Sequence, residues 1–587
     1  MDYINLVEVY EELNKTTKRL EKTHTLSEFL SGLDFRDIDH VLLLLEGRVF
    51  PAYDQREIGV ASRLMLKSIN VATGIDLMKI ESEWKKRGDL GLVTEALVKS
   101  KKQVTLGSAK LSTKKVFDNL RKLAELEGQG TVERKVQLIA ELLTCASPLE
   151  SKYIVKTVLE EMRIGVGEGV MRDAIVWAFF GKNIGIEYSR EENDIALKDR
   201  EIYNRYANEV QSAYDVSNNF ALVVKSAKLD GEKGIKNMEM HVGTPIKAML
   251  ALKADTIEEA FKTVGNPAAI EFKYDGFRIQ AHKDKDGAIR LFTRRLENVT
   301  SQFPDVVDSI GKNVKAKNFI LDSEAVGYNK KTGKYLPFQN ISQRIKRKYD
   351  IGKMAEDFPV ELNVFDIIYF EGKSVINEPF EKRRKLLESM VSEEPKKIVL
   401  SRSRIADKEK DVERFFDEAV KLGNEGLMFK SLNAPYKPGA RVGYMVKFKS
   451  VMETLDLVIV GAEWGEGKRS KWLSSYIVAC IDDDSKFEEI GRVSTGLKEK
   501  KEEGLSFEEM TKLLKPLILS EAGRIVRVKP EIVIEIAYEE IQKSPTYESG
   551  YALRFPRVVG LRTKDKSSRE SSSLAYVEKL YKSQKKS

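Results

Sequence analysis

The sequence predicts a multidomain protein that begins with an all-helical region, continues as a mixed α+β region and ends in a small all-β domain. Its 587 residues exceed what one hydrophobic core accommodates, so about three domains are expected. The apolar side chains of residues 1–225 recur at helical spacing. After residue 241 the pattern changes to β-branched and aromatic runs, and after residue 450 short strands recur. We place the domains at residues 1–235, 236–449 and 450–587.

The composition is that of a globular protein with a charged surface. There are 99 Lys and Arg residues against 91 Asp and Glu residues, a net charge of +8. This mild excess is compatible with a polyanionic partner, but an ordinary solvated surface explains it as well. Cys145 and Cys480 are too far apart to indicate a disulfide framework or a zinc ribbon. The acidic, amphipathic N-terminal segment is unlike a secretory signal, so we expect an intracellular protein without a membrane span.

The helical region contains one glycine-rich loop, "RIGVGEGVM" at 163–171. Its glycines superficially resemble a dinucleotide loop, but the preceding "KYIVKTVLEEM" has helical rather than strand periodicity. We therefore favour a helix–loop–helix in which Arg163 and the backbone around Gly165 and Gly167 face a phosphate, because helix N-termini attract anions.

The α+β region opens with "IEFKYDGFRIQAH" at 270–282, where apolar and polar residues alternate. The pattern predicts two strands joined at a tight turn, each with one face buried. Glu271, Lys273 and Asp275 share the opposite face, beside Gly276. A lysine in this setting is a salt-bridge partner, a phosphate clamp or a nucleophile.

Four further strand patterns downstream carry charged or aromatic residues. They are "FILDSEAV" (319–326, with Asp322 and Glu324), "NVFDIIYF" (363–370, with Phe365 and Asp366), "EGLMFK" (425–430, with Glu425 and Lys430) and "YMVKFK" (444–449, with Lys447 and Lys449). Each alone is typical of an ordinary strand with solvated charges. Their common order after the first pattern favours one shared site. In the last region, "LDLVIVGAEW" and "SSYIVACID" favour a small barrel, and the basic tail "YKSQKKS" is expected to fray.

In their order, "KYDGFR", "FTRRLEN", "LDSEAV", "VFDIIY", "EGLMFK", "VKFK" and "RFPR" resemble the motifs of ATP-dependent DNA ligases of archaeal and eukaryotic type. These enzymes belong to the covalent nucleotidyltransferase superfamily. "GDLG" at 88–91 and "RIGVGEG" also resemble the family's DNA-binding domain. The resemblance implies a helical DNA-binding domain, an adenylation domain of nucleotidyltransferase (ATP-grasp-like) type with antiparallel sheets, and an OB-fold domain.

The resemblance implies that Lys273 attacks the α-phosphate of ATP, expels pyrophosphate and carries AMP as a phosphoramide. A free lysine is neutral in only about one of several thousand molecules at pH 7. The nucleophile therefore needs nearby positive charge, for which Arg278, Lys430, Lys447 and Mg²⁺ are the candidates.

By the same resemblance, Glu271 reads adenine N6, Phe365 stacks on the base and Glu324 holds the ribose. Ribose and phosphate contacts are expected from Arg278, Arg294, Lys430, Arg441, Lys447 and Lys449. Glu324 and Glu425 are the expected Mg²⁺ carboxylates, with Mn²⁺ as an alternative ion. For Asp275 and Asp322, structural and catalytic roles both stay open. Arg562, Asp565 and Lys566 resemble the motif that orients pyrophosphate, the alternative being a solvated basic edge.

The resemblance implies sealing of nicked duplex DNA in replication, recombination, repair and cell division, by a cytoplasmic, chromosome-associated monomer. "KKQVTLG" at 101–107 lies where some relatives carry a sliding-clamp peptide; it has Gln103 and Leu106 but lacks the aromatic pair. The rivals are an RNA ligase or capping guanylyltransferase, which the long helical region opposes, and a non-catalytic repair scaffold, which the intact motif residues oppose. An NAD-dependent ligase would carry a cysteine zinc site that two cysteines cannot build.

Overall fold

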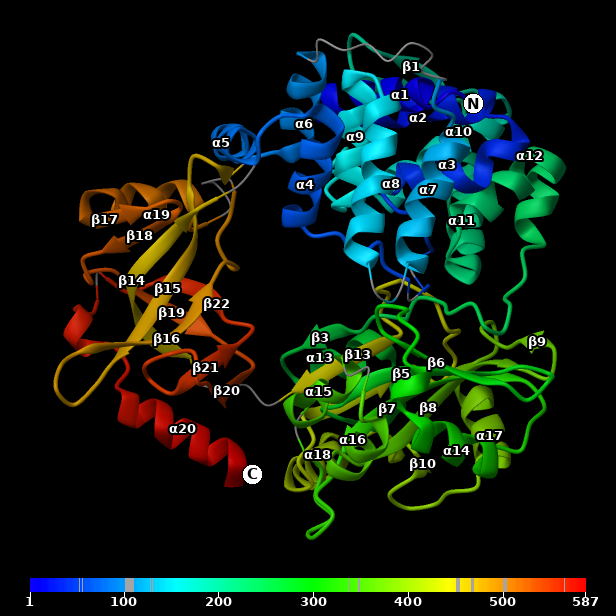
Figure 1. The fold of residues 1–587 in the computed structure, drawn as a ribbon. Coiled ribbons are helices and arrows are strands. Elements are labelled where there is room, and N and C mark those ends of the chain that lie inside the picture. Colours follow the sequence, from blue (N-terminus) through cyan, green and yellow to red (C-terminus); the bar gives the residue numbers. More distant parts are fainter. Residues whose placement is uncertain are drawn as a thin grey trace. The chain divides into compact units, whose positions relative to one another are not determined.

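The computed structural model describes residues 1–587 except 52, 55, 101–109, 127, 129, 337, 347–348, 450–453, 466–468, 500–503, 564 and 587. The chain forms two compact units, residues 1–412 with 428–447, and residues 413–427 with 448–587. Figure 1 shows the course of the ribbon. The segment at 101–107 that was considered as a clamp peptide lies outside the described residues. Within the described part of the chain, no helix is both long and apolar enough to span a bilayer.

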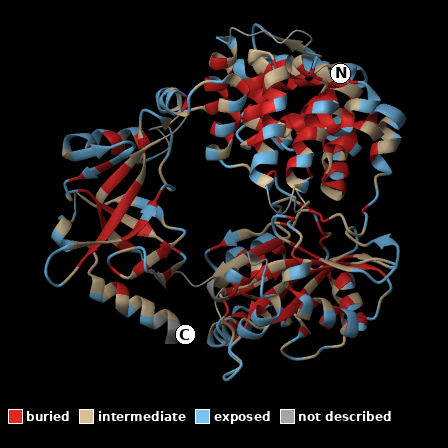
Figure 2. Cartoon of the chain, viewed as in Figure 1, coloured by how far each residue is buried: buried red, intermediate tan, exposed pale blue. Residues whose placement is uncertain are grey.

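The N-terminal region is helical, as predicted, apart from a small hairpin. Its helices are α1 (Tyr3–Lys15), α2 (Arg19–Gly32), α3 (Ile38–Leu45), α4 (Ser62–Thr73), α5 (Leu77–Arg87), α6 (Leu90–Lys99), α7 (Thr113–Glu125), α8 (Thr131–Cys145), α9 (Pro148–Val158), α10 (Glu168–Ile184), α11 (Arg200–Ser217) and α12 (Phe220–Lys236). The hairpin pairs β1 (Glu187–Ser189) with β2 (Asp194–Ala196). One apolar core draws on residues from Tyr3 to Ile235, and Figure 2 shows these buried residues on the inward sides of the helices.

The "GDLG" segment has a local physical explanation. Asp89 caps α6 by accepting a hydrogen bond from the backbone amide of Leu92. A Cβ on Gly91 would lie 2.8 Å from the Lys152 carbonyl oxygen of α9. The glycine therefore permits α6 and α9 to pack closely, which accounts for this motif without a ligand.

The middle region contains two sheets with helices around them. Its strands are β3 (Leu252–Ala254), β4 (Ala268–Lys273), β5 (Phe277–Lys283), β6 (Ile289–Thr293), β7 (Phe319–Gly327), β8 (Val360–Phe370), β9 (Lys373–Ser374), β10 (Ile398–Leu400), β11 (Ser403–Ala406), β12 (Gly426–Lys430) and β13 (Met445–Lys449). Its helices are α13 (Ile257–Val264), α14 (Pro304–Asn313), α15 (Phe338–Lys346), α16 (Ile351–Asp357), α17 (Phe380–Met390) and α18 (Glu409–Lys421). One sheet has the order β10-β8-β7-β5-β6, with β9 beside β8, and the other has the order β11-β4-β12-β13-β3.

The two strands predicted at 270–282 exist, but they do not form a hairpin. β4 belongs to the five-stranded sheet and β5 to the six-stranded sheet, so the chain crosses from one sheet to the other at Asp275-Gly276. The prediction of one buried face for each strand is also wrong, because all but the last residue of β4 is buried. Ile320, Ile368 and Met445 belong to one apolar cluster, which joins residues of the two sheets.

In the six-stranded sheet, strand direction follows the antiparallel prediction with one exception. β5 pairs antiparallel with β6 and β7, and β7 pairs antiparallel with β8. The edge strand β10 instead runs parallel to β8. The six-stranded sheet is therefore mixed at that edge.

The last region is mostly β, as predicted. Its elements are β14 (Leu455–Trp464), β15 (Leu473–Ile481), β16 (Phe487–Val493), α19 (Phe507–Leu514), β17 (Ile518–Ala522), β18 (Ile525–Val528), β19 (Val533–Ala537), β20 (Glu540–Lys543), β21 (Tyr551–Arg554), β22 (Arg557–Leu561) and α20 (Leu574–Lys586). β14 pairs with β15 on one edge, while its other edge pairs first with β19 and then with β18. The tail expected to fray belongs to α20, whose Val577 is buried in the core.

Candidate active site

Lys273 is the last residue of β4 and is half-buried at the crossing between the two sheets. A Cβ on Gly276 would lie 2.3 Å from the Ala325 carbonyl oxygen and 2.9 Å from Glu324 Cγ. Only glycine therefore permits this close approach of the crossing segment to β7. Asp275 Oδ2 accepts a hydrogen bond from the Phe338 backbone amide at 3.4 Å, which favours the structural role for Asp275.

Glu271, two residues before Lys273, carries a deeply buried carboxylate between two cations. Its side chain is 2% exposed, and its Oε2 lies 2.6 Å from Lys430 Nζ. Its Oε1 lies 3.6 Å from Arg384 Nη1. Among the residues that the structure describes, none donates a hydrogen bond to Oε1. One carboxylate oxygen is thus neutralised, and the other is a buried acceptor without a hydrogen bond among the described residues.

Lys430 is buried and makes several contacts. Besides its ion pair with Glu271, its ammonium lies 4.7 Å from the ring centroid of Phe365 and 4.6 Å from that of Phe380. These contacts combine charge pairing with cation–π attraction. The roles expected of Lys430, at the nucleotide and as positive charge near Lys273, stay predictions.

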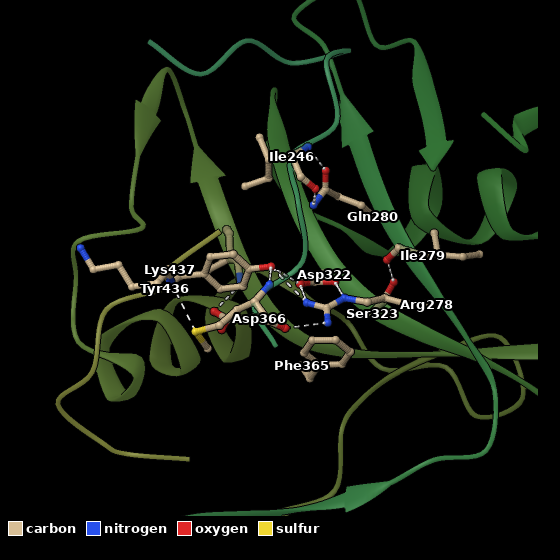
Figure 3. A network of polar contacts seen from close by, with 12 residues as sticks. Ile246, Arg278, Ile279, Gln280, Asp322, Ser323, Phe365, Asp366, Tyr436 and Lys437 are labelled. Carbon is tan, nitrogen blue, oxygen red and sulfur yellow. Dashed lines mark hydrogen bonds and ion pairs between the residues drawn. The ribbon is translucent and has the colours of Figure 1, made fainter. Parts of the chain in front are cut away.

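Arg278 and Asp322 form a second buried ion pair (Figure 3). Arg278 Nε donates to Asp322 Oδ1 at 2.7 Å, and Arg278 Nη2 contacts Asp322 Oδ2. Burial opposes the charged guanidinium, but Asp322 outweighs it and raises the pKa of Arg278. Tyr436 donates to the same carboxylate at 2.8 Å. These contacts favour a structural role for Asp322, and they pair it with Arg278, the residue expected at the ribose and phosphates.

Phe365 lies between these two ion pairs. Arg278 Cζ is 5.3 Å from its ring centroid, and Lys430 Nζ is 4.7 Å from it. The next residue, Asp366, faces away into a third buried pair, with Arg383 Nε at 2.7 Å. A half-buried ring fixed by two cations is a preformed platform on which a planar base could stack.

The remaining predicted nucleotide contacts of the first unit are more accessible. Glu324 is opposite Arg278 in the β5–β7 ladder and is half-buried. Arg294 is exposed after β6, Arg441 is exposed before β13, and Lys447 is half-buried within β13. The structure thus separates a buried, ion-paired group of residues from an accessible basic group.

Glu425 and Lys449 lie in the second unit and contact each other. Lys449 Nζ is 2.6 Å from Glu425 Oε2 and 3.3 Å from Glu539 Oε2. Burial disfavours the ammonium, but Glu425 and Glu539 outweigh burial and raise the pKa of Lys449. Lys449, expected to attract the triphosphate, is thus paired with the carboxylate expected to bind metal.

The residues expected to orient a leaving group also lie in the second unit. Arg562 Nε is 3.8 Å from Asp456 Oδ1, and Arg562 Nη1 is 3.7 Å from Glu535 Oε2. Lys566 Nζ lies 2.5 Å from Asp456 Oδ2. Asp565, 4.0 Å from Arg562, is 64% exposed. Lys566 thus makes a close ion pair with Asp456, whereas Arg562 makes only longer contacts, and these side chains form a partly solvated cluster around Asp456.

The donor set limits how a metal could be held. No group of three or more His, Cys, Asp or Glu side chains within the described residues is arranged to hold an ion. Glu324 and Glu425 offer oxygen ligands only, and Glu425 is already paired with Lys449. This fits Mg²⁺, which is usually bound by one or two carboxylates plus substrate phosphates and water.

The glycine-rich loop of the helical region is exposed and is supported from α2. Arg163, Gly165 and Gly167 are all exposed, and Gly167 precedes α10 without a side-chain cap. Lys22 Nζ donates to the Ile164 carbonyl oxygen at 2.5 Å. The preceding segment is the helix α9, so the predicted helix–loop–helix is present and a nucleotide-binding strand–loop is not.

Sequence reasoning missed three residues around the site. Arg383, Arg384 and Tyr436 each contact a predicted site carboxylate through bonds that link distant parts of the chain. The only sequence signal was "EKRRK" at 381–385, shortly after the "VFDIIY" strand. Paired arginines beside a strand of acidic and aromatic residues could have suggested buried ion pairs.

Comparison with known proteins gives the class. Three family models match in order: the DNA ligase N terminus over residues 2–176, the ATP-dependent DNA ligase domain over 248–449, and the ATP-dependent DNA ligase C-terminal region over 469–566. The fold of Pmar-Lig_PreS3 is similar, with a TM-score of 0.55 and 17% identity over 95% of this chain and 99% of that one. Together these matches define the class as DNA ligase.

Full-length relatives narrow the class to a family. The DNA ligase of Nanoarchaeum equitans is 46% identical, with 100% of this chain and 99% of that protein aligned. The DNA ligase of Archaeoglobus fulgidus is 42% identical over the same shares, and that of Thermococcus fumicolans is 41% identical over 99% and 98%. The chain belongs to the ATP-dependent DNA ligases. It is an enzyme, as the sequence motifs predicted, and neither an RNA ligase nor a scaffold is favoured.

Proposed function

We propose that the protein seals nicks in duplex DNA through a covalent Lys273–AMP intermediate. The observation that carries this proposal is the buried Glu271 carboxylate, two residues before Lys273 in β4, whose Oε1 has no hydrogen bond among the described residues and whose Oε2 pairs with Lys430, 4.7 Å from the Phe365 ring centroid. An adenine amino group is a donor of the kind that this oxygen requires. Phe365 would stack on the base, and Glu324 would contact the ribose.

The reaction would proceed in three steps. Lys273 Nζ loses a proton and forms a bond to the α-phosphorus of ATP, while the bond to the β-phosphate breaks and pyrophosphate leaves. An oxygen of the nick's 5′-phosphate then takes AMP from Lys273. Finally the 3′-hydroxyl attacks that 5′-phosphorus, and AMP leaves. In each step the protein would act mainly by positioning the groups and neutralising charge.

The positive charge near Lys273 would come from Arg278, Lys430 and Lys447, of which Arg278 and Lys430 also pair with buried carboxylates. Lys447, Arg294 and Arg441 would contact the phosphates. Glu324 and Glu425 would hold Mg²⁺, or Mn²⁺ in its place, and the ion would neutralise phosphate charge when bound.

We propose three domains, residues 1–235, 236–449 and 450–587, as a DNA-binding domain, a nucleotidyltransferase domain and an OB-fold. β14, which pairs with β15, β18 and β19, supports the last assignment. Arg562, Asp565 and Lys566 would orient pyrophosphate during the first step. Because they lie on a separate domain, it would close over ATP and reopen for DNA.

The DNA partner would be bound mostly through its phosphates, because nicks occur in any sequence. The exposed Arg163 loop before α10 supports one phosphate contact, where backbone amides and the helix N-terminus favour an anion. The protein would act inside the cell as a monomer. Its activity would serve DNA replication, recombination and repair. A sliding clamp stays a possible partner, although the segment at 101–107 lacks the aromatic pair of a clamp-binding peptide.

The test is nucleotide transfer to the protein itself. Wild type incubated with ATP and Mg²⁺ should gain the mass of AMP and seal a nicked duplex. Lys273→Ala should do neither while binding nicked DNA as before, and Lys285→Ala, an exposed lysine beyond β5, should match wild type. Mass gain with GTP alone, or sealing by Lys273→Ala, would overturn the proposal.

A further inference from the structure

The carboxylate of Glu271 is held by two cations from different parts of the chain. Lys430 comes from β12, and Arg384 comes from α17. Lys430 neutralises Oε2 at 2.6 Å, whereas Arg384 Nη1 lies 3.6 Å from Oε1, too far for a hydrogen bond. Arg384 therefore supplies charge beside Oε1 without occupying it as an acceptor.

Arg384 is itself fixed in place by two other contacts. Its Nε donates to Glu388 Oε1 at 2.9 Å, and its Nη1 donates to the Ser401 carbonyl oxygen at 3.0 Å. Ser403, two residues later, is opposite Glu271 in the β11–β4 ladder. The guanidinium is thus attached to the strand that flanks Glu271, and only 15% of its side chain is exposed.

We propose that Arg384, with Lys430, is a positioning residue that selects the base by keeping Glu271 Oε1 as a charged, acceptor-only oxygen. This inference rests on the proposed adenylation function and adds to it the means of base selection. An ionised carboxylate accepts hydrogen bonds and donates none. It would bind a purine with a 6-amino group and reject one with a 6-oxo group, whose oxygen is also an acceptor.

Lys430 links this selection to stacking. The same ammonium that neutralises Oε2 lies over the Phe365 ring. The oxygen that would read the edge of the base and the ring that would stack on its face are therefore fixed by one buried cation. A shift of Glu271 would also shift Lys430, and with it the cation beside the Phe365 ring. By restraining Glu271, Arg384 therefore also helps to hold the stacking platform in place.

The experiment measures the rate at which the protein gains a nucleoside monophosphate from ATP, inosine 5′-triphosphate or purine riboside 5′-triphosphate, which lacks a 6-substituent. Wild type should strongly prefer ATP. Arg384→Met should raise the KM for ATP about tenfold with kcat little changed, and should lower the ATP-to-inosine preference by a similar factor. Arg384→Lys should recover part of both losses. Lys385→Met, which replaces the exposed neighbour on the same helix, should change neither.

A double-mutant cycle tests whether Arg384 acts through Glu271. Glu271→Gln should already weaken the preference for ATP, because an amide can donate to a 6-oxo group. Adding Arg384→Met to Glu271→Gln should then change the preference little further. Full additivity, or an unchanged preference in Arg384→Met, would overturn the inference while leaving the proposed function intact.

The controls keep the two hypotheses distinguishable. Wild type that gains AMP establishes the function independently of Arg384, and wild type that gains no nucleotide overturns both proposals. Thermal unfolding checks that each variant folds. If Arg384→Met does not fold, Arg384→Lys carries the same test, since it keeps the charge but cannot reach Glu388, Ser401 and Glu271 together.

Discussion

The ion pairs of the first unit and those around Asp456 in the second unit use the same residue types in opposite ways. Asp322 is fully buried and receives a two-bond contact from Arg278, and Glu271 is 2% exposed. Arg562 is 35% exposed, and its nearest carboxylate oxygens are 3.7 Å and 3.8 Å away. Buried pairs preserve one geometry, whereas partly solvated pairs exchange partners more readily. The first arrangement suits a preformed pocket, and the second suits a group that acts in one step and releases.

The largest expected difference is in stability. Asp322→Asn should destabilise the protein by about 3–5 kcal/mol, because it leaves the Arg278 cation buried without its partner. Asp456→Asn, the matched change in the second unit, should cost less than about 1 kcal/mol because its partners are solvated. Chemical denaturation of both variants measures the two values. Equal losses would remove the distinction between the two regions.

The second expectation concerns the chemistry of the partly solvated cluster around Asp456. The double variant Arg562→Ala/Lys566→Ala should lower the rate of AMP addition to Lys273 by about 100-fold, since two charges at the leaving group are lost. Sealing of a nick that already carries 5′-AMP should be nearly unchanged. Arg569→Ala, an exposed arginine nearby, is the control. A comparable loss in both assays would show that the cluster does not act in one step alone.

The third expectation is a pH dependence confined to the first unit. Burial, and secondarily Arg290, lowers the pKa of His282 from its usual 6.5 to about 3. Between those values the unfolded chain binds a proton that the folded chain does not, so stability falls as pH falls through this window. From pH 7 to pH 5 the contribution of His282 should fall by about 2 kcal/mol. Burial raises the pKa of Glu46 to about 7 and that of Asp215 to about 6, so these carboxyls act in the opposite direction. Thermal unfolding of His282→Gln should therefore lack the His282 loss relative to wild type; an identical pH dependence of the two proteins would contradict the assignment.

The smallest expected effect is on nucleotide affinity. Phe365→Leu should raise the KM for ATP in AMP addition about tenfold with little change in kcat, because base stacking on an aromatic ring contributes about 1–3 kcal/mol. Phe370→Leu, at the far end of the same strand, should lower stability without this change in KM. Equal KM values for the two variants would argue against Phe365 as the platform.

Much of the fold was predictable because strand and helix periods are local. The strands around Asp322, Phe365, Lys430 and Lys447 appear where the alternating patterns predicted them. The prediction of a tight turn between paired strands at 270–282 was wrong for the same reason, since a local pattern cannot tell a turn within one sheet from a crossing between two sheets. β4 lies between β11 and β12, whose residues are distant from it in sequence, so its pairing and burial cannot be derived from its own alternation.

The sequence by itself determined the order of the motifs, the residue types that carry the chemistry and membership of a ligase family. Only the tertiary structure decided which charges remain available. It paired Lys430 with Glu271 and Arg278 with Asp322, and it brought Arg384 from α17 to the carboxylate that the motifs had already marked. The reason is physical: a charge acts through its distance from other charges and its exposure to water, and neither quantity is a property of a linear sequence.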